Sequence, residues 1–318
     1  MHNVQRSCLA QSRLMQMPNE YHRPVMLSEA VDGLNVRPDG TYVDVTFGGG
    51  GHSRAIMESL GADGRLYAFD QDEEARQNAI DDPRFTLIGE NFRYLKNYLR
   101  LYGVRRIDGL LADLGVSSHQ FDVAERGFST RFEGELDLRM DRRGDTTARD
   151  LVNGLDEESL ARILKLYGEL PNARQMAKAI VRARGEKEIV TTGDLKEAVS
   201  HHLPHKMENK YLAMLFQALR IEVNGELDAL REMLVQAAEL LPIGGRLAVI
   251  SYHSLEDRLV KNFMRAGNFE GVVEKDFYGN PMAPLHQLVS TAATAEEVAA
   301  NSRARSARLR VAEKVEVN

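Results

Sequence analysis

The chain has 318 residues, of which 43% are hydrophobic and 28% are charged, as in globular proteins with buried cores and unlike disordered chains. The single cysteine, Cys8, excludes a disulfide framework and a cysteine-based metal site, so we expect no metal and a reducing, cytoplasmic location. A net charge of −6 argues against indiscriminate coating of nucleic acid, which needs a strongly basic surface.

The first twenty residues lack the apolar centre of a signal peptide, and we expect residues 1–20 to form a flexible extension. The chain contains no apolar run near 18 residues in length, so we expect no membrane partner.

The segment from residue 41 to residue 115 alternates between strand and helix patterns. Apolar and β-branched runs predict strands at residues 41–47, 64–70, 84–91 and 106–115. Helical periodicity predicts helices at residues 53–60, 73–80 and 93–103. Because parallel neighbouring strands need crossovers, which helices provide, the pattern predicts an α/β fold with a doubly wound parallel sheet.

Between about residues 116 and 241 helices predominate and no strand pattern is convincing. Leu160, Ile163, Leu164 and Tyr167 follow the i, i+3, i+4, i+7 spacing of an amphipathic helix. Since the strand pattern resumes after residue 241, a helical insertion in one sheet domain explains this order better than two domains in series.

The segment after the insertion is predicted to return to the sheet. We expect a strand at 245–254 and a helix at 255–266 whose capping box is formed by Ser254 and Asp257. An edge or near-edge strand is predicted at 309–317. Residues 267–300 show little pattern and are expected to be rich in loops.

Four consecutive glycines, Gly48 to Gly51, follow the first predicted strand. Such a run loses much conformational entropy on folding, so a stable protein keeps it where the backbone turns sharply or approaches a ligand closely. In a doubly wound sheet the first strand-to-helix loop lies at the ligand crevice. A flexible turn is the alternative, but the flanking strand and helix patterns favour a ligand loop.

Two nucleotide-like ligands fit this loop in part. The dinucleotide fingerprint G-x-G-x-x-G is matched by Gly48 and Gly50 but ends in Ser53, so its third glycine is absent. The S-adenosylmethionine pattern, acidic-x-Gly-x-Gly-x-Gly, is matched by Asp44 and the same two glycines, with Thr46 in place of the first glycine. Spacing alone leaves both ligands open.

Acidic residues follow several predicted strands. Asp70, at the tip of the second strand, can accept both ribose hydroxyls of either ligand, or can cap the helix that follows. Asp44 and Asp113 end two other strands and are expected to face the same crevice, unless they bond only to strand-end backbone. Carboxylates gathered there favour the sulfonium cation of S-adenosylmethionine over a pyrophosphate.

Eight segments in chain order resemble the bacterial RsmH (MraW) family of methyltransferases. They read HRPVM, DVTFGGGGHS, DLGVSSHQFD, ERGFS, LDLRMD, FQALRIEVNGEL, GGRLAVISYHSLEDRLVK and NSRARSARLR. The resemblance runs from about residue 20 to residue 315, and DLGVSS, FQALRI and HSLEDR in this order are highly specific.

The resemblance implies a Rossmann-like class I methyltransferase sheet with an inserted all-helical domain. Residues 21–118 and 218–318 would form the domain that binds S-adenosylmethionine, and residues 119–217 the insertion that recognises RNA. The implied reaction is methyl transfer from S-adenosylmethionine to the N4 amine of a cytidine in the decoding region of 16S ribosomal RNA, within the small ribosomal subunit. The oligomeric state stays open.

Residue by residue, the matching motifs imply that the cofactor is contacted by Gly50, Gly51, His52, Asp70, Phe92, Asp113 and Gln120. Methyl transfer from sulfur is an in-line displacement, so alignment supplies much of the acceleration without a nucleophilic side chain. The lone pair of cytosine N4 is delocalised, and a hydrogen-bond acceptor that later takes its proton would lower the barrier. Asp113 is the first candidate for this acceptor. His253 and Ser251 are alternatives, although a lone histidine at such a place is more often a structural hydrogen-bonder.

Arginines in two segments are candidates for contact with RNA phosphates. Those in the loop after Asp113 share it with nearly as many acidic residues, so a salt-bridged loop is the alternative, whereas NSRARSARLR carries no acid. The candidates are Arg126, Arg142, Arg143, Arg303, Arg305 and Arg308.

Two other functions stay open at this level. An NAD(P)-dependent oxidoreductase would use the glycine loop for a dinucleotide, but it needs the missing third glycine. A noncatalytic RNA-binding assembly factor would not depend on Asp70 or Asp113 for its activity.

Overall fold

The computed structural model describes residues 24–279 and 281–316, so the predicted extension at 1–20, with Cys8, lies outside the described residues. Seven strands form one sheet in the order β3-β2-β1-β4-β5-β7-β6. Their bounds are β1 Thr41–Asp44, β2 Arg65–Phe69, β3 Phe85–Ile88, β4 Gly109–Asp113, β5 Arg246–Ser251, β6 Leu285–Ala292 and β7 Arg308–Lys314. The predicted α/β fold class is confirmed, with strands shorter than predicted.

Strands β1 to β5 pair in parallel, and β7 pairs antiparallel with both β5 and β6. From β1 the chain moves outward to β2 and β3, then returns to place β4 on the other side of β1. In open parallel sheets the ligand crevice lies at this reversal, outside the carboxyl ends of the strands. The crevice is therefore expected beyond the ends of β1 and β4.

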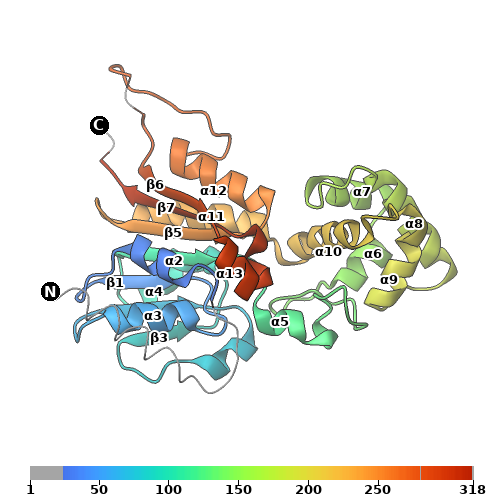
Figure 1. Ribbon diagram of the computed structural model, residues 1–318, viewed down its shortest axis with the longest axis horizontal. Helices are drawn as coiled ribbons and strands as arrows, with labels where there is room; N and C mark the ends of the chain where they lie inside the picture. Colours follow the sequence, from blue (N-terminus) through green and yellow to red (C-terminus); the bar gives the residue numbers. More distant parts are fainter. Residues whose placement is uncertain (1–23, 280, 317–318) are drawn as a thin grey trace.

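Helices cover both faces of the sheet (Figure 1). Alternate residues of a strand point to opposite faces, so Leu247 and Val249 of β5 enter one core while Ala248 and Ile250 enter the other. The first core packs against α4 Leu95–Leu101, α11 Glu226–Leu240 and α12 Ser254–Ala266. The second packs against α2 Leu27–Leu34 and α3 Gly51–Ser59.

Between β4 and β5 the chain forms a helical lobe that extends away from the sheet (Figure 1). Its described residues contain no strand, only an isolated bridge between Glu135 and Thr191. The predicted amphipathic positions Leu160, Ile163 and Leu164 are buried in a third core of its own. The elements are α5 Ser118–Asp122, η3 Ala124–Arg126, α6 Ala148–Gly154, α7 Glu157–Leu166, α8 Ala173–Glu186, α9 Thr192–Val199, η4 Ser200–His202 and α10 Glu208–Asn224.

The last helix of the lobe, α10, joins it to the sheet. Leu215 and Leu219 of α10 belong to the core of the lobe, whereas Ile221 belongs to the core under the sheet. Gly225, with φ 58°, then separates α10 from α11. One continuous helix thus crosses the position at which we expected the insertion to end.

Three local predictions were wrong. The helix expected at 73–80 is the 3₁₀ helix η1 Glu73–Asn78. The cap of α12 is His253, whose capping-box partner is Glu256, one residue earlier than the expected Ser254 and Asp257. The region expected to be loops contains β6 and α13 Ala295–Ala300. Because β6 is a largely exposed edge strand with an irregular register, it lacks the apolar alternation by which strands are recognised.

The remaining short elements are η2 Phe92–Tyr94 and η5 Ser302–Ser306. Within the described residues, no helix is both long enough and apolar enough to cross a membrane.

Arg310 ties the antiparallel strands to α12. It lies on β7, the predicted near-edge strand, and is 6% exposed. Its guanidinium donates to both oxygens of Asp257 on α12, at 2.7 and 3.0 Å, and to Gln287 and Ser290 on β6, each at 3.1 Å. One side chain therefore fixes three elements together.

Replacing Arg310 by alanine should lower the free energy of unfolding by about 3 kcal/mol, because the Asp257 carboxylate loses its bidentate partner in a largely buried place. Urea denaturation measures this loss. Arg308→Ala is the matched control, because Arg308 lies 3.9 Å from the same carboxylate but is 44% exposed. Its expected loss is below about 1 kcal/mol, and equal losses in the two variants would contradict the account.

Candidate functional site

The glycine loop leaves β1 and starts α3. Gly48 and Gly50 adopt φ 50° and 75°, which L side chains rarely adopt, so glycine is needed there. A Cβ atom on Gly51 would lie 2.1 Å from Pro24, and one on Gly50 2.9 Å from the ring of Phe47. Around Gly49 the space is open. The open side of the loop is therefore at Gly48 and Gly49, whereas Gly50 and Gly51, the predicted cofactor contacts, pack against protein.

Asp44 braces this loop from inside. Its side chain is fully buried, and its carboxylate accepts hydrogen bonds from Ser53 Oγ at 2.7 Å and from the Thr46 backbone N–H at 3.0 Å. Burial raises its pKa, although the nearby His52 and these donors offset part of the rise. The expectation that Asp44 faces the crevice is wrong, because its oxygens are used to join the end of β1 to α3.

Asp70, which follows β2, links the loop to the next strand. Its two oxygens accept from the backbone N–H groups of Gly48 and Asp72, each at 2.8 Å. Burial raises its pKa to about 6, and the two amide donors offset part of that rise. Since a carboxylate has about four acceptor positions, Asp70 retains capacity for further donors.

Asp113, the last residue of β4, lies among the side chains of Thr46, His52 and Tyr252. Its backbone N–H donates to Thr46 Oγ1 at 2.6 Å, and its Oδ1 accepts from the hydroxyl of Tyr252 at 2.7 Å. Its Oδ2 lies 3.8 Å from Nδ1 of His52, whose Nε2 is 3.1 Å from the Val25 carbonyl oxygen. Burial raises the pKa of Asp113 to about 6, against the lowering effects of His52 and Tyr252.

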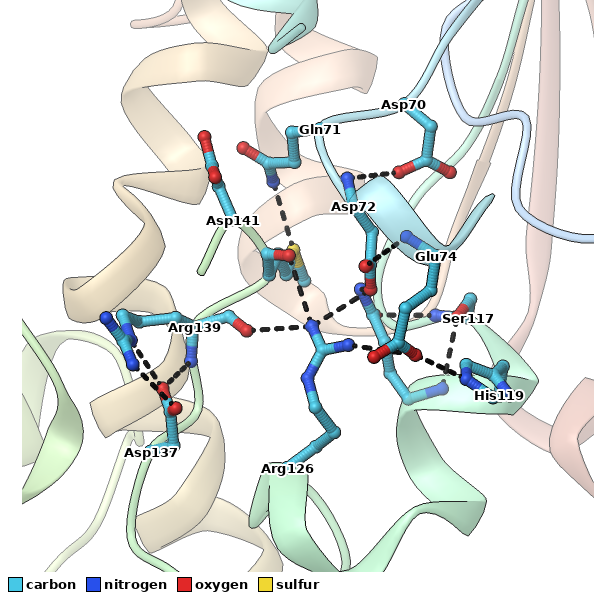
Figure 2. A network of polar contacts seen from close by, with 12 residues as sticks. Asp70, Gln71, Asp72, Glu74, Ser117, His119, Arg126, Asp137, Arg139 and Asp141 are labelled. Atoms are coloured by element: carbon cyan, nitrogen blue, oxygen red, sulfur yellow. Dashed lines mark hydrogen bonds and ion pairs between the residues drawn. The ribbon is translucent and has the colours of Figure 1, made fainter. Parts of the chain in front are cut away.

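A polar network joins the helical lobe to the segment after β2 (Figure 2). Arg126, only 1% exposed, lies 2.9 Å from Asp72 Oδ2 and 3.4 Å from Glu74 Oε2, and it donates to two carbonyl groups of the lobe. Gln120 donates to the same Asp72 oxygen at 2.7 Å. The prediction that Arg126 contacts RNA phosphate is not supported, because its guanidinium is buried among carboxylates. Gln120, a predicted cofactor residue, is therefore connected to Asp70 through Asp72, whose backbone N–H donates to the Asp70 carboxylate.

A cavity of about 40 Å³ lies between the strand ends and α11. Phe92, a predicted cofactor residue, lines it. Sequence reasoning missed most of the other lining residues. Gln71 and Asn91 lie in the loops that follow β2 and β3, so their place after predicted strands was a usable signal. Glu226 of α11 lies within the quoted segment FQALRIEVNGEL, but nothing in that segment pointed to the cavity. Further lining residues are Leu114, Gly115 and Asn224.

His253 serves the cap of α12. Its Nδ1 accepts from the Glu256 backbone N–H at 3.4 Å, and its Nε2 lies 3.2 Å from the Glu256 carboxylate. Burial raises the pKa of Glu256, but His253 and Arg220 outweigh it, so the pKa is lowered. Both ring nitrogens thus face Glu256, which favours the structural alternative for His253 over proton transfer.

Glu226, His253 and Glu256 bring ligand atoms within 4.8 Å of one another. Both oxygens of Glu226 accept from the Arg220 guanidinium, at 2.8 and 2.9 Å. Arg220 therefore supplies the positive charge at this cluster.

The other predicted RNA contacts lie at the surface with different partners. Arg143 pairs with Asp141 and Glu90, and Arg303 donates to Asp122 at 2.8 Å while its guanidinium lies 5.7 Å from the Phe121 ring. These contacts place η5 beside α5, where the sheet meets the lobe (Figure 1). Exposed guanidinium groups are carried by Arg142, Arg305 and Arg308.

The family model described as the MraW methylase family matches residues 19–315. The chain belongs to the MraW methylase family. The methylase is 56% identical over 297 residues to a protein of Flavobacterium johnsoniae, covering 93% of this chain and 98% of that protein. It is 57% identical to a protein of Phocaeicola vulgatus, covering 92% and 97% of the two chains. Both relatives are named ribosomal RNA small subunit methyltransferase H.

The free energy of unfolding of this methylase should depend on pH, because burial raises the pKa of Asp113. A carboxyl whose pKa rises from 3.8 to about 6 on folding stabilises the folded state only when protonated. This contribution is therefore gained as the pH falls through 6 and is absent at pH 7. Relative to Asp113→Asn, which cannot titrate, the wild type should gain about 2 kcal/mol in unfolding free energy between pH 7 and about pH 4.5.

Asp82→Asn is the control for this comparison. Hydrogen bonds from Arg84 hold the pKa of Asp82 at about 2, so its carboxylate stays mostly ionised over this pH range in both folded and unfolded chains. The difference between Asp82→Asn and the wild type should stay constant. A constant difference for Asp113→Asn as well, in urea titrations at both pH values, would refute the raised pKa.

Proposed function

We propose that this methylase transfers a methyl group to the N4 amine of a cytidine in the decoding region of 16S ribosomal RNA. Family membership and the relatives' names support a ribosomal RNA methyltransferase, and its methyl donor is S-adenosylmethionine. The main support for the N4 reaction is the position of Asp113. Its carboxylate accepts hydrogen bonds at the tip of β4, beside the crevice of the sheet. An amine needs such an acceptor for its proton.

The residues around the crevice fit the parts of the donor. Asp70 would accept the ribose hydroxyls, and Phe92 would line the space for the base. The open backbone at Gly48 and Gly49 would lie along the methionyl part, where carboxylates suit a sulfonium cation.

Asp113 would take the proton that the amine loses. A hydrogen bond from N4 to this carboxylate localises the nitrogen lone pair and prepares it for attack on the methyl group. A pKa of about 6 keeps Asp113 mostly ionised at pH 7 and still able to accept a proton. No cysteine follows Cys8, so the chain between residues 9 and 318 offers no thiol for covalent activation of a ring carbon.

RNA would enter where the sheet meets the helical lobe. The net charge of −6 requires local contacts, and Arg305, Arg308 and Arg142 offer exposed guanidinium groups for phosphates. The insertion at 119–217 would recognise the shape of the RNA within the small ribosomal subunit. Arg126 would act by joining the lobe to the crevice rather than by touching RNA.

Transfer of tritiated methyl groups tests the proposal. The substrates are small subunits and naked 16S RNA, both from cells that lack the activity, followed by digestion and nucleoside analysis. Label in N4-methylcytidine is expected. Label in another nucleoside would contradict the proposed position. Absence of transfer to either substrate would favour a noncatalytic assembly factor, and tight binding of NADH in calorimetry would favour an oxidoreductase.

Asp70→Ala should weaken binding of S-adenosylhomocysteine by about 1–3 kcal/mol, because the ribose hydroxyls lose their acceptor. Isothermal titration calorimetry measures this change. Asp81→Ala, which removes an exposed carboxylate after η1, is the matched control and should bind normally. An unchanged affinity of Asp70→Ala would remove Asp70 from the site.

A further inference from the structure

Tyr252 directly follows β5, and its side chain points toward Asp113. The register of the parallel pair sets Asp113 beside Ile250, so the chain two residues later brings Tyr252 next to Gly115. A Cβ atom built on Gly115 would lie 3.7 Å from the Tyr252 ring, in ordinary contact. The phenol donates its hydroxyl proton to Asp113 Oδ1 at 2.7 Å. The ring of Tyr252 therefore packs beside the backbone at the tip of β4.

The hydroxyl of Tyr252 helps to keep Asp113 ionised among the charged groups that surround it. His52 of α3 lies 3.8 Å from Oδ2, and the carboxylates of Asp44 on β1 and Glu256 on α12 lie close enough to disfavour a negative charge on Asp113. The pKa of the Tyr252 phenol is raised well above its ordinary value, mainly by burial. The negative charges of Glu256 and of Glu297 on α13 raise it further. The phenol therefore stays protonated and remains a donor at neutral pH.

The two oxygens of Asp113 are consequently unequal. Oδ1 is held by Tyr252, whereas the 3.8 Å between Oδ2 and His52 exceeds hydrogen-bond distance. An incoming amine would therefore meet Oδ2 as the oxygen with unused acceptor capacity.

We infer that Tyr252 is a positioning residue for methyl transfer, which fixes Asp113 through Oδ1 so that Oδ2 accepts the proton of the attacking amine. This inference rests on the proposed function. In the step, the N4 nitrogen forms a bond to the methyl carbon while the carbon–sulfur bond breaks, and the sulfonium becomes a neutral thioether. The nitrogen passes one proton to Oδ2, and Asp113 ends as a neutral carboxylic acid.

Tyr252→Phe isolates the hydroxyl, because the ring that packs beside Gly115 is kept. Loss of a hydrogen bond that favours the carboxylate raises the pKa of Asp113. The acidic limb of the kcat/KM profile should therefore move to higher pH by about one unit, with activity restored at high pH. A merely structural role would instead lower the activity equally at every pH.

The control is Tyr42→Phe, which also removes a hydrogen-bonded hydroxyl from a buried ring. The Tyr42 hydroxyl accepts from the Arg37 backbone N–H at 2.8 Å, at the amino end of β1 and away from the crevice. Its pH profile should coincide with that of the wild type. Binding of S-adenosylhomocysteine should be the same in the wild type and in both variants.

A second measurement works without any substrate. Carbon-detected NMR of the Asp113 carboxyl in the unliganded protein should give a higher titration midpoint for Tyr252→Phe than for the wild type. An unchanged midpoint overturns the inference, as does a changed midpoint with an unshifted activity profile. If the wild type makes no N4-methylcytidine, the proposed function fails on its own, whatever the NMR midpoint.

Discussion

The structure depends on three carboxylates kept largely out of water at the carboxyl ends of neighbouring parallel strands. Asp44 ends β1, Asp70 follows β2 and Asp113 ends β4, and burial raises the pKa of each. Backbone amides, hydroxyl groups and His52 offset part of this cost. The remaining excess of negative charge suits a positively charged ligand. The same gathering of buried carboxylates therefore raises their pKa values and favours a sulfonium donor.

The helical lobe is attached to this same group of carboxylates. Asp72 donates its backbone N–H to Asp70, while its side chain holds both Arg126 and Gln120 of the lobe (Figure 2). Movement of the lobe would therefore disturb the segment that carries Asp70. The lobe and the segment after β2 are thus linked through two side chains, Arg126 and Gln120.

Features set by local sequence were predictable. Apolar runs located the five parallel strands, and the strand ends in turn located Asp70 and Asp113, because parallel strands present their carboxyl ends at one edge. The burial of Arg126 and the cap at His253 were not predictable, since they depend on partners from other elements or on exact helix ends. Likewise β6 was missed because its exposed residues carry no alternation, and its pairing with β7 is what defines it.

The central claim is that the glycine loop and the carboxylates around it hold the methyl donor. The most direct measurement is a crystal structure of the protein with S-adenosylhomocysteine. The account predicts ribose hydroxyls bonded to Asp70 and the homocysteinyl chain along Gly48 and Gly49, next to Asp113. A complex in which the molecule binds elsewhere, with this loop unoccupied and the carboxylates unchanged, would contradict it.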